Sequence, residues 1–104
     1  MGNVYSTAFL ESQGLSGSVS FVVAPGKVAV LRDLDVFVPS GGSGAGVFLI
    51  GSAGQTIWAE NTIGGAFAWM HWRGRQVVEA GGTVTVTTTG PADVTLSGYL
   101  LDAP

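Results

Sequence analysis

Apolar and polar residues alternate along most of this chain, most regularly toward its C-terminus. Thr and Val alternate from Gly82 to Thr89, and a second alternating run follows from Val94 to Leu101. Because β-branched side chains lose little freedom in an extended backbone, this pattern favours strands. With six earlier runs of similar character, the sequence predicts eight extended segments: Val4–Leu10, Ser18–Val23, Val28–Val38, Val47–Gly51, Thr56–Glu60, Ala66–Val78, Gly82–Thr89 and Val94–Leu101.

Glycine and proline separate these runs. The segment Ala24–Lys27 has Pro25 and Gly26 where a type II turn requires them, and residues 39–44 form a Gly/Ser-rich loop. Helical periodicity is missing, and turn signals recur about every 8–12 residues, which is typical of a β-sandwich. We therefore predict one all-β domain over residues 1–104, an antiparallel, jelly-roll-like β-sandwich of about eight strands. An immunoglobulin-like sandwich, which has seven or nine strands, is the competing interpretation.

Alternation also assigns side chains of the two longest runs to faces. In Val28–Val38, the face that includes Val28 and Val30 is apolar except for Arg32 and is expected to be the core face, and the other face carries Asp33 and Asp35. In Ala66–Val78, Trp69 and Trp72 fall on opposite faces if the strand is regular. One of the two then leaves its own core, where it could contact a neighbouring subunit. The alternative is a bulge between them that keeps both tryptophans in the core.

The composition changes the picture because so few residues are charged. Charged residues make up 11% of the 104, against about 25% in an ordinary soluble domain, and 46% are hydrophobic. The mean hydropathy is +0.44. We interpret this balance as surface covered by other subunits. The alternative is a Ser/Thr/Gly-rich surface that is polar without being charged.

Charge and segment patterns exclude several classes of partner. The net charge is −3 and the four basic residues form no stripe, so we expect no nucleic-acid partner. No stretch of 18 apolar residues and no secretory signal occurs, so we expect no membrane association and synthesis in a cytoplasm. The chain has no cysteine, which excludes disulfides and thiolate metal sites.

Candidate chemistry is sparse. The single histidine, His71, lacks metal-ligand or triad spacing, so we interpret it as a structural residue that is hydrogen-bonded or packed. The acids Asp33 and Asp35 could bind Ca²⁺ or could pair with Arg73 and Arg75, and we favour the ion pairs, either across neighbouring strands or across a subunit boundary. We therefore expect no enzyme, no cofactor and no resident metal.

Two further aromatic features have structural and functional readings. Gly98, next to Tyr99, would let a neighbouring backbone or aromatic ring approach closely. Four aromatic residues could form a platform for sugar stacking, although aromatics in a sandwich are usually core: Trp58, Trp69, Trp72 and Tyr99.

The tail WRGRQVVEAGGTVTVTTTGPADVTLSGYLL, from Trp72 to Leu101, resembles the C-terminal ends of small β-sandwich virion proteins of tailed double-stranded DNA phages. The run VAPGKVAVLRDLDVFV is similar to their early part. The resemblance implies a capsid decoration protein located in the virion, acting as a homotrimer on the major capsid protein. It implies no catalytic residue.

Within that reading, we expect contacts between subunits to be anchored by aromatic residues and aligned by charges. The anchors are Phe67, Trp69 and Trp72, and the register is fixed by Arg73 and Arg75 with Asp33 and Asp35. A tail- or baseplate-associated virion protein and a carbohydrate-binding β-sandwich module are the alternative functions.

Overall fold

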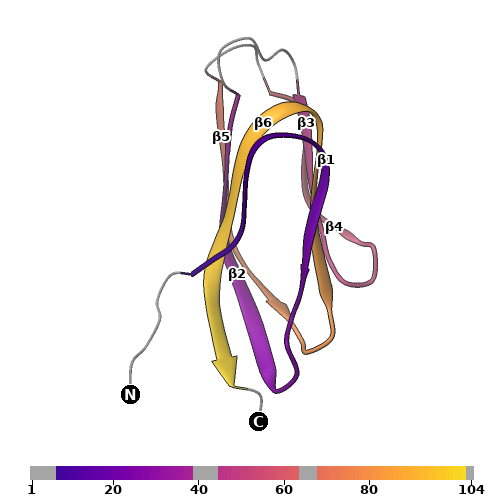
Figure 1. The fold of residues 1–104 in the computed structure, drawn as a ribbon, viewed down its shortest axis with the longest axis vertical. Coiled ribbons are helices and arrows are strands. Elements are labelled where there is room, and N and C mark those ends of the chain that lie inside the picture. Colours follow the sequence, from indigo (N-terminus) through magenta and orange to yellow (C-terminus); the bar gives the residue numbers. More distant parts are fainter. Residues whose placement is uncertain (1–6, 39–44, 64–67, 103–104) are drawn as a thin grey trace.

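A computed structural model describes residues 7–38, 45–63 and 68–102, and every strand in these ranges pairs antiparallel with its neighbours. Figure 1 shows the six strands arranged as an elongated body. The strands are β1 (Thr7–Val22), β2 (Lys27–Phe37), β3 (Ala45–Ile50), β4 (Thr56–Ile63), β5 (Trp69–Val78) and β6 (Thr83–Asp102).

The longest strand, β6, organises the sheet, whose order is β4-β3-β6-β2-β5. One side of β6 pairs with β1 over most of its length. Its other side pairs first with β3 and then, nearer the C-terminus, with β2. Among the described residues, the end strands β4 and β5 come close without pairing, so the sheet is nearly closed.

The structure has six strands where the sequence predicts about eight, because two pairs of predicted runs are continuous. Ser18–Val23 and the described part of Val4–Leu10 belong to β1, and the last two runs belong to β6. Val23 lies just beyond the end of β1, and Gly82 lies just before the start of β6. Figure 1 shows β1 and β6 bending together over one end of the molecule. The breaks at the glycines are therefore bends across which pairing continues, with register shifts between Ser12 and Gly17.

Side-chain hydrogen bonds hold this double bend. Gly14, at φ +63°, donates its backbone N–H to Asp93 Oδ1 at 2.8 Å. The hydroxyl of Thr88, which is 2% exposed, donates to the carbonyl of Leu15 at 2.5 Å. A buried polar group is thus satisfied where β1 departs from regular geometry.

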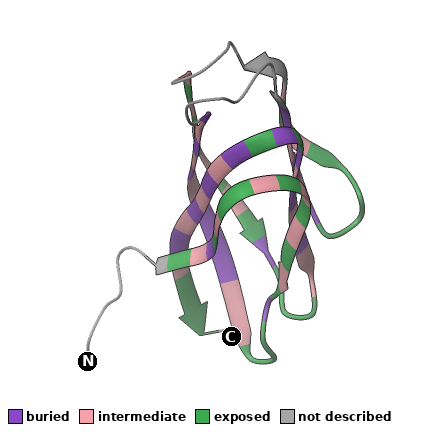
Figure 2. Cartoon of the chain, turned by 45° about the horizontal axis from the view of Figure 1, so that its top comes forward, coloured by how far each residue is buried: buried purple, intermediate pink, exposed green. Residues whose placement is uncertain are grey.

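Alternation in β6 supplies much of the core. Figure 2 shows buried residues alternating with more exposed ones along this strand, whereas β1 beside it is mostly exposed or half-buried. The buried residues pack with those of β2 and β3 into one cluster, whose largest fully buried members are Leu31, Leu34, Leu49, Leu96, Val23, Val36, Val38, Val47, Val84, Val86 and Val94. Burial of such side chains contributes about 1.5–3 kcal/mol each and is the main stabilising term.

A β-bulge at Arg32 changes the faces of β2. Its pairings with both neighbours shift between Leu31 and Asp33. Ala29 and Leu31 therefore face the core before the bulge, and Leu34 faces it afterwards. The predicted core face, with Val28 and Val30 on it, is wrong for the first part of the strand because the extra residue reverses the alternation.

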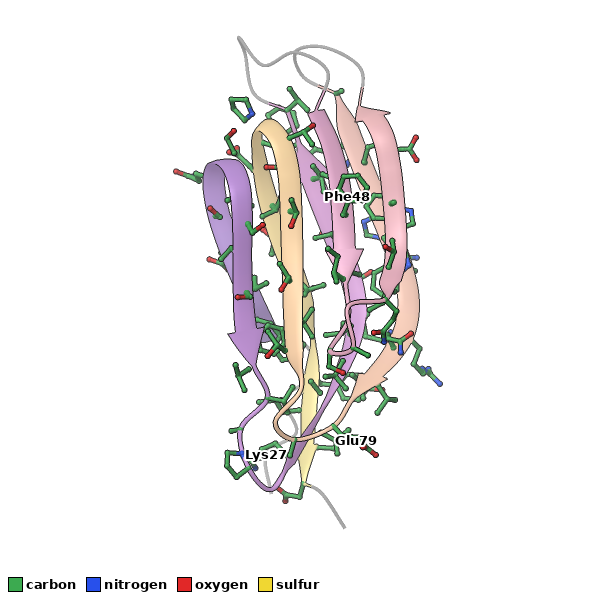
Figure 3. The ribbon with its side chains drawn as sticks, turned by 90° about the vertical axis from the view of Figure 1, so that its right-hand side faces the viewer. Lys27, Phe48 and Glu79 are labelled. Atoms are coloured by element: carbon green, nitrogen blue, oxygen red, sulfur yellow. The ribbon has the colours of Figure 1, made fainter. Side chains whose placement is uncertain are left out.

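Two turns meet at one end of the molecule, where Figure 3 labels Lys27 and Glu79, away from Phe48 on β3. Lys27 donates its backbone N–H to Ala24 at 3.2 Å, and Gly26 has φ +78°, which confirms the predicted type II geometry. Val23 exchanges backbone hydrogen bonds of 2.9 Å with Gly81 and Gly82. The segment 39–44, predicted to be a loop, lies outside the described residues.

The expected close approach at Gly98 is confirmed. A Cβ atom on this residue would lie 1.9 Å from the carbonyl oxygen of Val30 and 3.0 Å from a ring carbon of Phe9. Only glycine fits at this point, where β6 passes the chain of β2 just before the bulge.

Candidate interaction face

The most distinctive surface is formed by the outward side chains of β2 and β5, called here the β2–β5 face. Its members are Val30, Asp33, Asp35, Phe37, Trp69, His71, Arg73, Arg75 and Val77. Exposure alternates regularly along β5, so every second residue from Trp69 to Val77 points outward. The bulge in β2 is what turns Asp33 and Asp35 to this same side, next to the basic residues of β5.

An ionic ladder crosses the middle of the face. Asp33 lies opposite Arg73, and Asp35 lies opposite His71. Arg73 Nε donates to Asp33 Oδ1 at 3.4 Å, and His71 Nε2 lies 3.3 Å from the same oxygen. His71 Nδ1 makes a short contact with Asp35 Oδ1.

The predicted pairing of acids with bases is therefore confirmed for Asp33 and Arg73 but not for Arg75. His71 takes the position beside Asp35, which agrees with its prediction as a hydrogen-bonded structural histidine. Arg75 lies in the part of β5 opposite the bulge, because Leu31 pairs with Gln76 while Asp33 pairs with Arg73. No hydrogen bond or ion pair of Arg75 is formed with any residue that the structure describes.

These ion pairs align strands more than they stabilise them. The side chains of Asp33, Asp35 and His71 are about one-third exposed and that of Arg73 is 73% exposed. Exposed pairs contribute only about 0–1 kcal/mol because water and salt screen them. In the described ranges, no three acidic, histidine or cysteine side chains are arranged to hold a metal ion, and the oxygens of Asp33 and Asp35 are contacted by bases instead.

An aromatic pair borders the ladder. The rings of Phe37 and Trp69 meet edge to face, with centroids 5.2 Å apart and an interplanar angle of 69°. Trp69 is nevertheless 64% exposed. An exposed indole fixed by a second ring is a preformed contact surface, since little freedom is left to lose on binding.

Of the other two predicted anchors, Trp72 lies on the inner side of the sheet. Trp72 points to the inner side of β5 and packs against the core, so the two tryptophans occupy opposite faces as regular alternation predicts. The pairing of β5 with β2 is continuous from Trp69 to Trp72, so the bulge weighed as a way to bury both tryptophans does not lie between them. Phe67 lies outside the described residues.

The four aromatics considered as a sugar platform do not gather. Trp58 and Trp72 both pack against the core. Tyr99 of β6 pairs with Val30 of β2, whereas Trp69 of β5 pairs with Phe37, farther along β2. Each such set of paired residues is called a rung here. Seven residues of strand separate those rungs, or about 23 Å, which is too far for one sugar ring to touch both.

The end of the face beyond the bulge is apolar. Val77 is 54% exposed, and its partner Val30 is only 4% exposed. Leu101, paired with Val28, is 50% exposed. Apolar groups thus lie on both sides of the ionic ladder.

The opposite part of the sheet has a different surface. Thr85 and Thr87 lie beside Ser18 and Ser20 of β1, and the hydroxyls of Ser18 and Thr87 are 2.8 Å apart. This uncharged hydroxyl surface agrees with the alternative explanation of the low charge content, a Ser/Thr-rich exterior. The Ser/Thr-rich explanation therefore applies to this side of the molecule.

Sequence reasoning missed Phe37 and His71 as members of the face. The signal was present, because alternation places Phe37 with Asp33 and Asp35, and His71 with Arg73. What the sequence did not contain was the register that brings the two strands together. Arg32 marks the bulge, and its buried Nε has no hydrogen-bond partner among the described residues. In the sequence this residue is visible only as a charged interruption of an apolar strand face.

Comparisons with known proteins give a fold and no family. No family model matches the chain, and no curated protein matches it. The Drosophila NLP core, studied for its pentamer formation and histone binding, has a TM-score of 0.56 at 14% identity, over 95% of this chain and all of that one. The likeness shows a shared fold.

Two other solved structures are more distant. A family GH115 4-O-methyl-α-glucuronidase has a TM-score of 0.43 at 9% identity, over 98% of this chain and 17% of the enzyme. The VP2 subviral particle of infectious bursal disease virus has a TM-score of 0.37 at 14% identity, over 92% of this chain and 32% of that one. The described segments include no helix that could cross a membrane.

Proposed function

We propose that this chain is a structural subunit of a virion that works through contacts between copies. The observation that carries the proposal is the β2–β5 face, on which Trp69 and Val77 are 64% and 54% exposed at either side of an ionic ladder. Large apolar groups around a polar centre cost free energy in water and are favourable when a partner covers them.

The more specific form of the proposal follows from the resemblance to phage virion proteins. We take the chain to be a capsid decoration protein that forms a homotrimer and docks on the major capsid protein of a tailed phage. Its action would be mechanical, since each copy bridges neighbouring capsid subunits. A stable contact of this kind buries about 1,200–2,000 Å² in total.

The jelly-roll topology belongs to this proposal. The bent strands β1 and β6 each contribute two arms, which together with β2 to β5 give eight arms in the nearly closed sheet. The Drosophila protein of similar fold is described by its pentamer formation, so a ring of copies is compatible with such a fold. Its histone binding is not carried over, because the seven acids of this chain form no run and three of them face bases.

Two measurements test the proposal. Sedimentation velocity of the purified chain between about 1 and 100 μM is expected to give three times the protomer mass of 10.6 kDa. The second measurement is co-sedimentation of the purified chain with phage heads assembled without this protein, to which it is expected to bind. A monomer at the highest concentration that also fails to bind heads overturns the proposal. A trimer that binds tails and not heads overturns decoration and favours the tail-associated alternative.

A further inference from the structure

We propose that the β2–β5 face is the contact between copies, with the β2 side of one copy against the β5 side of the next. In this contact Arg75, two residues along β5 from the partner of Asp33, pairs with Asp33 of the neighbouring copy. The inference rests on the proposed self-association and names the surface and the pairing that produce it.

The charges on the face are sorted by strand. The acids Asp33 and Asp35 are on β2, and the basic side chains Arg73 and Arg75 are on β5, with His71 between the two acids. Neighbouring strands lie about 4.8 Å apart, so an acidic column runs beside a basic column. A surface divided in this way is complementary to a second copy of itself.

Symmetry decides which groups would meet. In a closed ring whose axis runs parallel to the strands, each copy turns this face toward the axis. The β2 half of the face on one copy then meets the β5 half of the face on the next copy. Rotation about such an axis leaves height along the strands unchanged. Acids then meet bases, and the Phe37 side of the aromatic pair meets the Trp69 side of the next copy. This holds for two, three or five copies alike.

The contrary arrangement is unfavourable. A twofold axis perpendicular to the strands, lying between the two faces, would place the acidic column of one copy over the acidic column of the other. Asp33 and Asp35 of the two copies would then repel each other. Charge sorting therefore selects an axis along the strands.

The face also has unused binding capacity. A guanidinium has five N–H donors, and that of Arg75 has no partner among the residues the structure describes. Asp33 shares one oxygen between His71 and Arg73, and the Arg73 contact is long at 3.4 Å. A carboxylate offers about four acceptor positions, so both acids can accept a donor from another copy.

Sedimentation of full-length variants, each with its fold checked by circular dichroism, tests the inference. Trp69→Ser and Arg75→Gln are expected to raise the subunit dissociation constant by about tenfold or more, as loss of central contact residues does. Matched controls lie on other surfaces. Val22→Ser removes an apolar side chain that is 62% exposed, and Ser20→Asp changes the net charge by the same amount as Arg75→Gln. Both controls are expected to stay assembled.

A charge-exchange experiment tests the pairing itself. The variant with Asp33→Arg and Asp35→Arg should not assemble alone, nor should the variant with Arg73→Asp and Arg75→Asp. Mixed, the two are expected to form hetero-oligomers, detected by native mass spectrometry, because each contact between unlike variants sets acids against bases. An even-numbered assembly satisfies every contact in this way, whereas a ring of three keeps one like-charged contact and should be weaker than the wild type.

The outcomes separate this inference from the proposal on which it rests. A wild type that assembles while Trp69→Ser and Arg75→Gln assemble equally well overturns the inference and leaves self-association standing. A wild-type monomer overturns self-association itself. If the monomer binds heads and Trp69→Ser abolishes that binding, the face docks on the shell, and the contact between copies is refuted.

Discussion

Replacing Gly98 by alanine tests the point where β6 and β2 approach most closely. The added Cβ would lie 1.9 Å from the Val30 carbonyl oxygen, whereas real Cβ atoms essentially never come within 3.0 Å of such an atom. The obstacle is backbone, so a side-chain rotation cannot relieve it. The two strands must separate by more than 1 Å beside the bulge at Arg32.

The expected cost follows from what that separation disrupts. Gly98 and its partner Leu31 are buried, so backbone groups that lose their hydrogen bonds here are not rescued by water. Each such group costs about 1–3 kcal/mol. Without a clash, glycine to alanine within a strand would instead stabilise the fold by about 0.5–1 kcal/mol. We expect a net loss of about 2–4 kcal/mol, a large part of the roughly 5–15 kcal/mol of a typical domain.

Urea unfolding followed by the fluorescence of the three tryptophans measures this loss. With a slope of about 2 kcal/mol per M, the midpoint should fall by about 1–2 M. Gly54→Ala serves as the control, because its position has φ +82° but open space, and its cost should be limited to about 1–2 kcal/mol. A Gly98→Ala variant as stable as the wild type, or more stable, refutes the close approach.

Three further predictions concern β5 and the end of β6. Trp72→Ala should lower the free energy of unfolding by about 3 kcal/mol in urea, because the indole packs on the core; dissociation of a fully stable protomer would contradict that placement. Gly74→Ala should cost about 1–2 kcal/mol in the same assay, since its Cβ would lie 2.6 Å from the movable Trp72 ring, and an unchanged midpoint would show that the ring does not lie there. The hydrogen bond that Lys27 donates to Asp102, together with the positive charge of Lys27, holds the pKa of Asp102 below the usual 3.8. This pair should therefore stabilise the fold above pH 3.8 and lose its effect as the pH falls through the lowered pKa. Thermal melts of wild type and Asp102→Asn should therefore differ slightly at pH 6 and converge in acid well below pH 3.8, and a difference that persists there would contradict the pairing.

The positions of β2 to β5, the type II turn at Gly26 and the two faces of β5 were readable from the sequence. Each depends on a local rule: alternation in an extended chain, or the backbone conformation that one glycine permits. The opposed placement of Trp69 and Trp72 follows from three residues of regular strand. A glycine inside a strand also signals a close approach, so the requirement for Gly98 was visible in the sequence. The sequence did not show that the Val30 carbonyl oxygen imposes this requirement.

Tertiary structure alone decided the rest, because pairing joins segments far apart in the chain. Asp33 and Arg73 are forty positions apart, and the register that sets them side by side, with His71 next to Asp35, depends on the shift in pairing at Arg32, which lies opposite Gly74 and Arg75. Pairing between distant segments also keeps β1 and β6 continuous through their bends, where the glycines in the sequence suggested that the strands end. Local sequence determines which side chains share a strand face, whereas only the assembled sheet determines which strands meet and therefore which charges become neighbours.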